Sequence, residues 1–213
     1  MRRALLLVPV LVGLLAGPSL ATEPKQPATP EQINAYYDSG QWGKDTTAIV
    51  DKARVTLDKA LKNKVKKPAL TFDIDDTLLS AYSCAKPDDF TRSAIAVCVV
   101  TGKQTKIKQT VALYKYAQKK KVAVFLITAR PENLRVQTVG HLKAAGLTGY
   151  KGLSLRPIDD PSTSTQVPYK SGERKKIQGK GYTIVANLGD QKSDLAGGFG
   201  KGFKIPNPMY TSP

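Results

Sequence analysis

The middle of the chain alternates between two hydrophobic patterns. Short apolar runs of strand length are separated by longer stretches in which apolar residues recur at helical spacing. The expected strands are Leu70–Ile74, Val122–Ile127, Gly152–Leu155, Thr183–Leu188 and Phe203–Ile205. The expected helices are a segment from about Pro30 to Ser39–Gly40, Thr46–Lys62, Lys106–Lys120, Pro131–Ala145, Ser171–Gln178 and a short helix after Ser193. Strands that alternate with helices predict an α/β fold with one parallel sheet covered by helices on both faces.

The N-terminal residues follow a different pattern. Arg2 and Arg3 precede a short apolar run, and small residues follow up to Ala21, which is the order of a secretory signal peptide. The apolar run is too short for a comfortable membrane span. We therefore expect residues 1–21 to be a signal peptide, 22–32 to be a flexible lead-in, and 33–213 to be the folded domain. The mature protein is expected to be periplasmic or secreted, without a stable membrane span.

The composition adds a strong positive charge. The 213 residues carry a formal net charge of +16, and the lysines and arginines are spread along the chain. This charge indicates either a solvated basic surface or a field that attracts anionic substrates. Aromatic residues do not interleave with the basic clusters as a stacking platform for single strands requires. Nucleic acid is therefore not an expected partner.

Two cysteines lie close together in the sequence. Cys84 and Cys98 are the only ones, and both fall in a segment at about 79–105 that looks like an insert over the end of the first expected strand. In an oxidising compartment such a pair favours a disulfide, which would close a loop of about 15 residues. Two buried free thiols are the alternative.

Carboxylates gather where two of the expected strands end. Asp73, Asp75 and Asp76 follow the first strand, and Asp190 and Asp194 follow a later one. Because ligands of parallel sheets collect beyond the carboxyl ends of the strands, these side chains should share one pocket. Buried carboxylates need a cationic partner, and an oxygen-rich pocket suits a hard cation such as Mg²⁺.

Polar residues also follow the other elements. Thr128 and Arg130 end the strand that begins at residue 122, and Lys170 opens a helix ahead of the last carboxylates. Taken singly, a threonine there is more often a packing residue, and a lysine is usually solvated. His141 is the single histidine and is expected on a helix surface, which argues against chemistry built on a histidine nucleophile or on a site made of several histidines. The sequence has no Gly-x-Ser-x-Gly motif, the usual signal of a serine hydrolase.

Together and in this order, these residues resemble the motifs of the haloacid dehalogenase-like (HAD) phosphohydrolases. The matching phrases are Asp73-Ile74-Asp75-Asp76-Thr77, Thr128, Lys170 and the run from Gly189 and Asp190 to Asp194. Within the superfamily, the chain is most similar to the exported acid phosphatases of the class B, class C and plant types, from about Ile33 to Pro206. It departs from them at Asp76, where they commonly carry glutamate. The resemblance implies a HAD-like Rossmannoid three-layer sandwich with a central parallel sheet, N-terminal helices and a small cap insert.

The resemblance also implies a role for each matched residue. Asp73 would be the nucleophile that forms an aspartyl-phosphate, and Asp75 would be the general acid and base. Mg²⁺ would be held by Asp73, Asp190 and the backbone carbonyl of Asp75, with Asp194 supporting its outer shell. The phosphoryl oxygens would be bound by Thr128, Lys170 and Arg130.

The implied function is an exported, magnesium-dependent phosphomonoesterase of the acid phosphatase type. Because the cap insert is small, its substrates would be a broad range of small phosphate esters or nucleotides. One alternative is a catalytically weak storage or binding protein with the same fold. Another is a phosphotransferase that uses acceptor alcohols in place of water. The presence of both Asp73 and Asp75 favours the enzyme over the storage protein.

Overall fold

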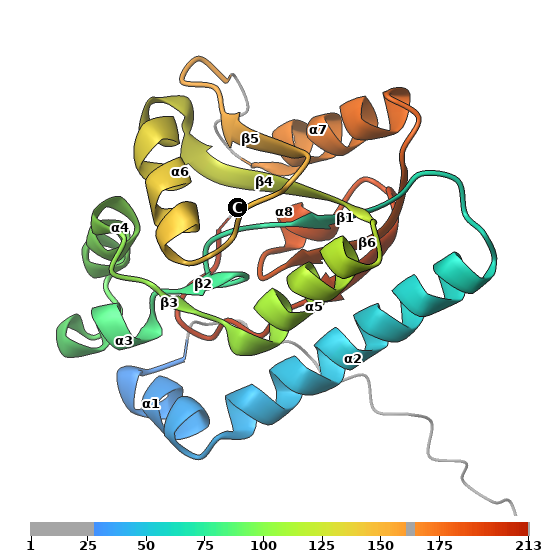
Figure 1. Ribbon diagram of the computed structural model, residues 1–213. Helices are drawn as coiled ribbons and strands as arrows, with labels where there is room; N and C mark the ends of the chain where they lie inside the picture. The colour runs from blue at the N-terminus through green and yellow to red at the C-terminus, as the bar shows by residue number, and fades with distance from the viewer. Residues whose placement is uncertain (1–27, 161–164, 213) are drawn as a thin grey trace, which may run out of the picture.

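The fold is built on a five-stranded parallel sheet with strand order β5-β4-β1-β6-β7, shown in Figure 1. The computed structural model describes residues 28–160 and 165–212, so the expected signal peptide lies outside the described residues. The strands are β1 (Pro68–Phe72), β4 (Ala123–Pro131), β5 (Gly152–Arg156), β6 (Thr183–Gly189) and β7 (Lys201–Lys204). All of them run in one direction, which confirms the predicted α/β class and places every carboxyl end at the same edge of the sheet.

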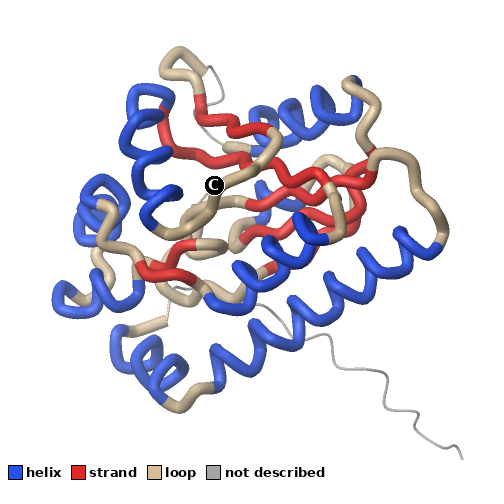
Figure 2. Tube along the Cα trace, in the orientation of Figure 1, coloured by secondary structure: helices blue, strands red, loops and turns tan. Residues whose placement is uncertain are grey.

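Helices cover both faces of this sheet (Figures 1 and 2). On one face lie α2 (Gln41–Lys62) and α5 (Lys108–Lys119), and on the other lies α7 (Val167–Gly179). Apart from the helices of the insert described below, the other α-helices among the described residues are α1 (Pro30–Asp38), α6 (Arg135–Ala144) and the short α8 (Lys192–Leu195). No helix among the described residues is both long enough and apolar enough to cross a membrane.

The side chains of β1 alternate between the two faces of the sheet, so this strand packs against helices on both faces. Leu70 and Phe72 pack into the larger core cluster with Leu57 of α2, whereas Ala69 belongs to the cluster that contains Ile177 of α7. Successive side chains of a strand point to opposite faces of the sheet. A buried strand of this kind must therefore be apolar at nearly every position, which is the pattern that the sequence shows.

Several element boundaries differ from the predicted ones. The expected helix at Pro131 begins only at Arg135, because Pro131 keeps an extended backbone at the end of β4 and a short 3₁₀ turn (η2, Glu132–Leu134) follows it. Helix α2 begins earlier than expected, at Gln41, directly after Gly40 turns the chain at a φ of 74°. Helix α1 does begin at Pro30 as expected, with Thr29 as its N-cap, so its first residues overlap the expected lead-in of residues 22–32.

The segment expected as an insert forms a small subdomain at the carboxyl edge of the sheet (Figure 1). It is closed by two short antiparallel strands, β2 (Leu79–Ser80) and β3 (Thr105–Lys106). Between them lie α3 (Tyr82–Ala85), a 3₁₀ turn (η1, Lys86–Asp88) and α4 (Arg92–Thr101). The Tyr82 ring stacks on Tyr37 of α1 at a centroid distance of 3.8 Å. Aromatic packing thus attaches the insert to the N-terminal helices.

A disulfide joins α3 to α4 in this insert. Cys84 and Cys98 are bonded, with a Cα–Cα distance of 5.9 Å, so of the two alternatives from the sequence the structure has the bridge. Cross-linking a loop of this length stabilises the folded chain by about 3 kcal/mol in the chain-entropy model.

Replacing both cysteines by serine should therefore lower the free energy of unfolding by about 3 kcal/mol, because the unfolded chain regains the freedom of the loop. Urea unfolding of the two proteins side by side measures the difference. In the parent protein, thiol titration under denaturation without reductant should find no free thiols. Two titratable thiols would show that the bridge does not form.

Candidate active site

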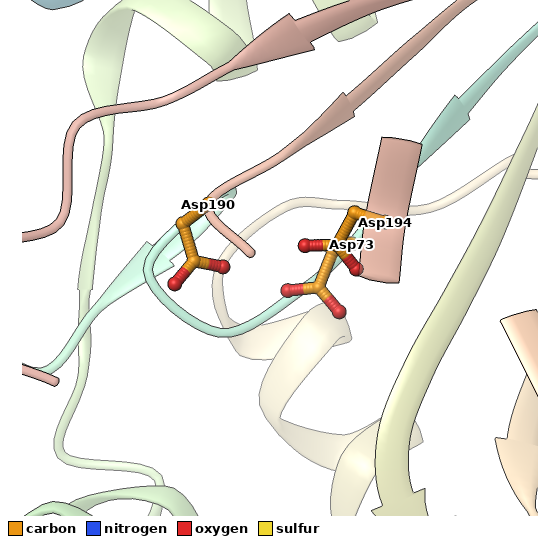
Figure 3. Close-up of side chains that lie close together, drawn as sticks. All are labelled: Asp73, Asp190 and Asp194. Atoms are coloured by element: carbon orange, nitrogen blue, oxygen red, sulfur yellow. The ribbon is translucent and has the colours of Figure 1, made fainter. Parts of the chain in front are cut away.

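Three buried carboxylates converge at the carboxyl edge of the sheet (Figure 3). Asp73 follows β1, Asp190 follows the neighbouring β6, and Asp194 lies in α8. One carboxylate oxygen from each lies within 4.8 Å of the others. The structure therefore brings Asp73, Asp190 and Asp194 together in one buried cluster at the edge of the sheet where the strand-end rule places them.

The backbone around Asp73 is fixed by the sheet and by a tight turn. The Asp73 N–H donates to the carbonyl of Leu188 at 2.9 Å, which extends the β1–β6 ladder by one residue. The carbonyl of Ile74 then accepts from the N–H groups of Leu78 at 2.9 Å and Leu79 at 3.0 Å. Asp76 has a φ of 51°, a left-handed conformation that aspartate tolerates better than most residues. This turn aims Asp73 and Asp75 at the pocket.

Gly189 is what lets Asp194 approach the end of β6. A Cβ atom at residue 189 would lie 2.1 Å from the Cβ of Asp194, which no real pair of atoms allows. Asp194 also accepts a hydrogen bond from the N–H of Gln191 at 2.8 Å, closing a capping box at the start of α8. The glycine of the predicted motif is therefore required by packing between the strand and the helix.

Lys170 is the internal cation of the cluster. Its ammonium donates to Asp73 Oδ1 at 3.0 Å and to Asp194 Oδ1, and all three side chains are buried. Burial alone would lower the pKa of Lys170, but the charges of Asp194 and Asp73 outweigh it and raise that pKa. Lys170 therefore stays protonated and neutralises part of the negative charge.

The remaining charge favours a bound cation. Burial raises the pKa of Asp73 well above its ordinary value, although Lys170 opposes the shift, and repulsion from Asp194, Asp190 and Asp75 adds to it. Burial and the charge of Asp194 likewise raise the pKa of Asp190. A divalent ion would relieve this repulsion, and carboxylate oxygens are the ligands that hard cations prefer. The donor set fits the metal that the resemblance to the HAD phosphohydrolases implies.

Asp75 is held by Arg130 and Gln104. Arg130 of β4 donates to Asp75 Oδ2 through Nε at 3.0 Å and to Oδ1 through Nη2 at 2.7 Å. Gln104, just before β3, donates to Asp75 Oδ1 at 2.9 Å and accepts from Arg130 Nη2 at 2.7 Å. The guanidinium expected to bind phosphoryl oxygens is thus engaged by Asp75 in this structure, while it still lines the cleft. A role for Arg130 at the phosphoryl group stays a prediction.

Two other sequence expectations have different outcomes. Thr128 is fully buried on β4, and its hydroxyl accepts a hydrogen bond from the Arg130 N–H at 3.2 Å, so its contact with a phosphoryl oxygen also stays a prediction. The expected surface position of His141 is confirmed only in part. Its ring is half-buried because Gly102, at the end of α4, has no side chain and leaves space for it. His141 is therefore a contact between α6 and the insert.

A cleft of about 370 Å³ opens onto the carboxylates. Its inner end contains Asp73, Asp75, Arg130, Lys170 and Asp190. Much of its remaining lining is an apolar wall, which consists of Ile95, Ala96, Val99 and Val100 of α4 together with Pro131 and Leu134, and Arg92 of α4 also lines the cleft. A small charged group fits at the inner end, and a larger apolar group fits against the wall.

Sequence reasoning missed several residues that shape the site. Arg174 is fully buried, and its Nη1 donates to the backbone carbonyl of Asp194 at 2.7 Å. It lies one helical turn after Lys170, which is the signal that could have found it. Gln104, Asn207 and Tyr210 carry no such signal, because each reaches the site from a distant, irregular segment.

The buried Asp76 provides a test of this electrostatic arrangement in the metal-free protein. Burial raises the pKa of Asp76 to about 7, although hydrogen bonds from the Ala81 N–H and the Tyr210 hydroxyl oppose the shift. The folded protein thus binds a proton more tightly at Asp76 than the unfolded chain does. We expect the free energy of unfolding to fall as the pH rises from about 4 to 7.

Thermal unfolding in chelator at several pH values measures this dependence. The near-isosteric Asp76→Asn variant should have a shallower slope, because it removes the titrating group. Asp38 and Glu132 are exposed and have lowered pKa values, so they titrate at the acidic end of this range. A melting temperature that rises with pH over this window would contradict the assignment.

Comparisons with known proteins agree with this geometry. The family model of the HAD superfamily, subfamily IIIB (acid phosphatase), matches residues 19–213. Vegetative storage protein 1 of Arabidopsis thaliana is 38% identical over 72% of this chain, and acid phosphatase 1 of Solanum lycopersicum is 37% identical over 65% of it. The matched regions cover 58% and 57% of those two proteins, so the chain spans somewhat over half the length of these curated relatives.

A solved structure shows the same fold. The class C acid phosphatase of Bacillus anthracis superposes with a TM-score of 0.69 at 19% identity, covering 85% of each chain. With the family model matching nearly the whole sequence, the chain belongs to the HAD superfamily, subfamily IIIB, the acid phosphatase family.

Proposed function

We propose that this protein is an exported, Mg²⁺-dependent phosphomonoesterase that acts through an aspartyl-phosphate on Asp73. The observation that carries the proposal is the convergence of Asp73, Asp190 and Asp194 around Lys170 at the inner end of an open cleft. A buried nucleophilic carboxylate surrounded by other carboxylates is unsuited to binding an anion unless cations offset the charge. A divalent ion and Lys170 together provide that offset.

The first chemical step belongs to Asp73. One of its carboxylate oxygens attacks phosphorus, the bond from phosphorus to the ester oxygen breaks, and the leaving alcohol takes up a proton. Lys170 lies within hydrogen-bond distance of Asp73 and can therefore bind an oxygen of the phosphoryl group as it arrives. Mg²⁺, when bound, supplies Lewis-acid stabilisation of the phosphoryl charge.

The second step returns the enzyme to its starting state. Water attacks the phosphorus of the aspartyl-phosphate, the bond between phosphorus and the carboxylate oxygen breaks, and inorganic phosphate leaves. Asp75 is the group proposed to protonate the alcohol and later to take the proton from this water. Its contacts with Arg130 and Gln104 fix its position at the cleft.

The apolar wall of the cleft supports a preference for esters with an apolar leaving group. Val99 of α4 lines the cleft, whereas Val97 of the same helix is 56% exposed and lines a separate depression beside the disulfide. The Val99→Asp variant should lower kcat/KM for an aryl phosphate about tenfold more than for glycerol phosphate.

The Val97→Asp variant is the matched control and should leave the ratio of the two kcat/KM values unchanged. Both values are measured at saturating Mg²⁺. An equal loss for both esters in Val99→Asp would mean that the wall does not contact the leaving group.

The proposed activity is tested with a panel of phosphate monoesters that includes aryl, nucleotide and glycerol esters. Each is assayed with Mg²⁺, after removal of metal by chelator, and after Mg²⁺ is added back. We expect phosphate release that is lost with chelator and restored by Mg²⁺. Absence of release from every ester under all conditions would refute the proposal.

A storage or binding role is the second candidate, because a vegetative storage protein is among the relatives. The retained Asp73, Asp75 and Lys170 favour the enzyme, since a storage role does not require these three charged groups, of which Asp73 and Lys170 are buried, to meet in one cleft. The ester panel separates the two candidates directly.

Export is proposed on two grounds. The sequence begins with the order of a signal peptide, and the Cys84–Cys98 disulfide is of the kind that persists in oxidising compartments. Detection of the processed protein outside the cytoplasm, beginning near residue 22, would support it.

A further inference from the structure

The chain after β7 returns to the active site. We call residues Asn207–Ser212 the C-terminal strap. Its start is fixed where the Trp42 indole N–H donates to the carbonyl of Pro206 at 2.8 Å, and its middle is fixed by Met209, which is buried in the cluster that contains Ile33. Tyr210 and Ser212 line the same cleft as Asp73 and Asp190. The strap is therefore a wall of the active site, although it lies beyond the segment in which the motifs fall.

The strap is linked to the Asp190 carboxylate by two sets of hydrogen bonds, one direct and one through Gln191. The Asn207 side-chain amide donates to Asp190 Oδ2 at 2.7 Å. The Gln191 amide donates to the same oxygen, and its own carbonyl oxygen accepts from the backbone N–H of Ser212 at 2.8 Å. Both donors to Asp190 Oδ2 thus depend on the strap.

This arrangement fixes how Asp190 faces the cluster. With two donors on Oδ2, the other oxygen, Oδ1, accepts only a longer contact of 3.3 Å from the Thr77 hydroxyl among the described residues. Asp190 is repelled by Asp194, so a carboxylate without these donors would gain by turning away from it. The two amides oppose that rotation and leave Asp190 Oδ1 as the oxygen with the weaker hydrogen bonding.

The amide of Asn207 is itself held in a defined orientation. Its side-chain carbonyl accepts from the N–H of Met209 at 2.9 Å, which is a local turn of the kind that asparagine favours. The amide N–H₂ must then point away from the turn and toward Asp190. One residue therefore forms the turn of the strap and donates to the carboxylate.

We propose that Asn207 is a positioning residue that, with Gln191, orients Asp190 so that its less engaged oxygen can bind a divalent cation together with Asp73 and Asp194. The proposal rests on the proposed function, because Asp190 is a metal ligand only there. Outer hydrogen bonds to ligating carboxylates commonly change metal affinity by about 10- to 100-fold. Asn207 should therefore control the affinity for the metal.

The test is Mg²⁺ binding to the full chain without substrate, measured by titration calorimetry on metal-free protein. The key variant is Asn207→Ser, because a serine hydroxyl can still accept from the Met209 N–H but is too short to donate to Asp190. We expect its Kd for Mg²⁺ to rise about tenfold relative to the parent. Asn207→Leu, which removes both hydrogen bonds, should raise the Kd at least as much.

Tyr210→Phe is the matched control within the strap. It removes the hydrogen bond of 2.8 Å to Asp76 and leaves both donors to Asp190 in place, so its Kd for Mg²⁺ should equal that of the parent. Melting temperatures in chelator establish that each variant is folded. If Asn207→Ser unfolds, Gln191→Leu tests the second donor, with the same expected increase in Kd.

The outcomes distinguish the two proposals. If the parent binds Mg²⁺ and the folded Asn207→Ser variant binds it equally well, the positioning role is wrong and the proposed function stands. If the parent does not bind Mg²⁺ at all, both the positioning role and the proposed Mg²⁺-dependent function are refuted. A weaker Kd in Asn207→Ser together with an unchanged Kd in Tyr210→Phe supports the positioning role.

Discussion

Replacing Asp73 by asparagine is expected to reduce turnover by about 10⁴-fold or more, the scale seen when a covalent nucleophile is removed. The amide oxygen of asparagine is a poor nucleophile, and it cannot form the acyl-phosphate that divides the reaction into two steps. The shape of the side chain is nearly unchanged, so the hydrogen bond from Lys170 can be retained. Steady-state assays of the purified variant with its best ester measure the loss.

The fold of this variant should be intact. Burial raises the pKa of Asp73, which means that its charged form is disfavoured in the folded protein, and a neutral asparagine does not suffer that penalty. Its melting temperature in chelator should therefore be no lower than that of the parent. Asp88→Asn, in the insert, is the control for an aspartate outside the cluster. Turnover by Asp73→Asn near the parental rate would remove Asp73 as the nucleophile.

Replacing Lys170 by methionine should affect both stability and activity. Without the ammonium, Asp73 and Asp194 remain buried with no internal cation between them. Breaking a buried ion pair in this way typically costs about 3–5 kcal/mol. Activity should fall by about 10³-fold, because a charge that stabilises the transferring phosphoryl group is removed. Urea unfolding in chelator and steady-state kinetics in Mg²⁺ measure the two effects.

The exposed Lys175 of the same helix offers a matched control. Lys175→Met removes one positive charge at a solvated position, and its stability should stay within about 0.5 kcal/mol of the parent. The comparison separates the local role of Lys170 from the loss of net charge. If Lys170→Met has the same free energy of unfolding and the same turnover as Lys175→Met, the buried ion pairs of Lys170 contribute to neither stability nor activity.

The hydrophobic pattern of the sequence was sufficient to predict the parallel sheet and the residues that follow its strands. The apolar runs at β1 and β6 are buried on both faces, and the residues that follow them must emerge at the same edge. This reasoning predicted that Asp73 and Asp190 meet. Lys170 was expected there only through the resemblance, since a lysine at the start of a helix is usually exposed.

Other contacts could not be read from the sequence because they depend on long-range packing. Asn207 and Gln104 lie in irregular segments, where no period indicates which way a side chain points. The place of His141 in a predicted helix, between Gly140 and Leu142, does not indicate its partial burial, which arises because the missing side chain of Gly102 makes room for its ring. Helix α6 was expected to begin at Pro131, since proline favours both a first helical turn and the extended end of a strand.

The central claim is that Asp73 becomes covalently phosphorylated during turnover. The most direct measurement is a rapid acid quench of Asp75→Asn with an ester labelled in its phosphoryl group, followed by peptide mapping. Asp75→Asn is used with an aryl phosphate whose phenolate leaves without a proton from Asp75, so the phosphorylated enzyme should still form and should accumulate when the group that activates water is missing. The account predicts label on the peptide that contains Asp73, released by hydroxylamine as expected for an acyl-phosphate. Label on any other residue, or phosphate released in the parent protein without a labelled intermediate in the variant, would contradict it.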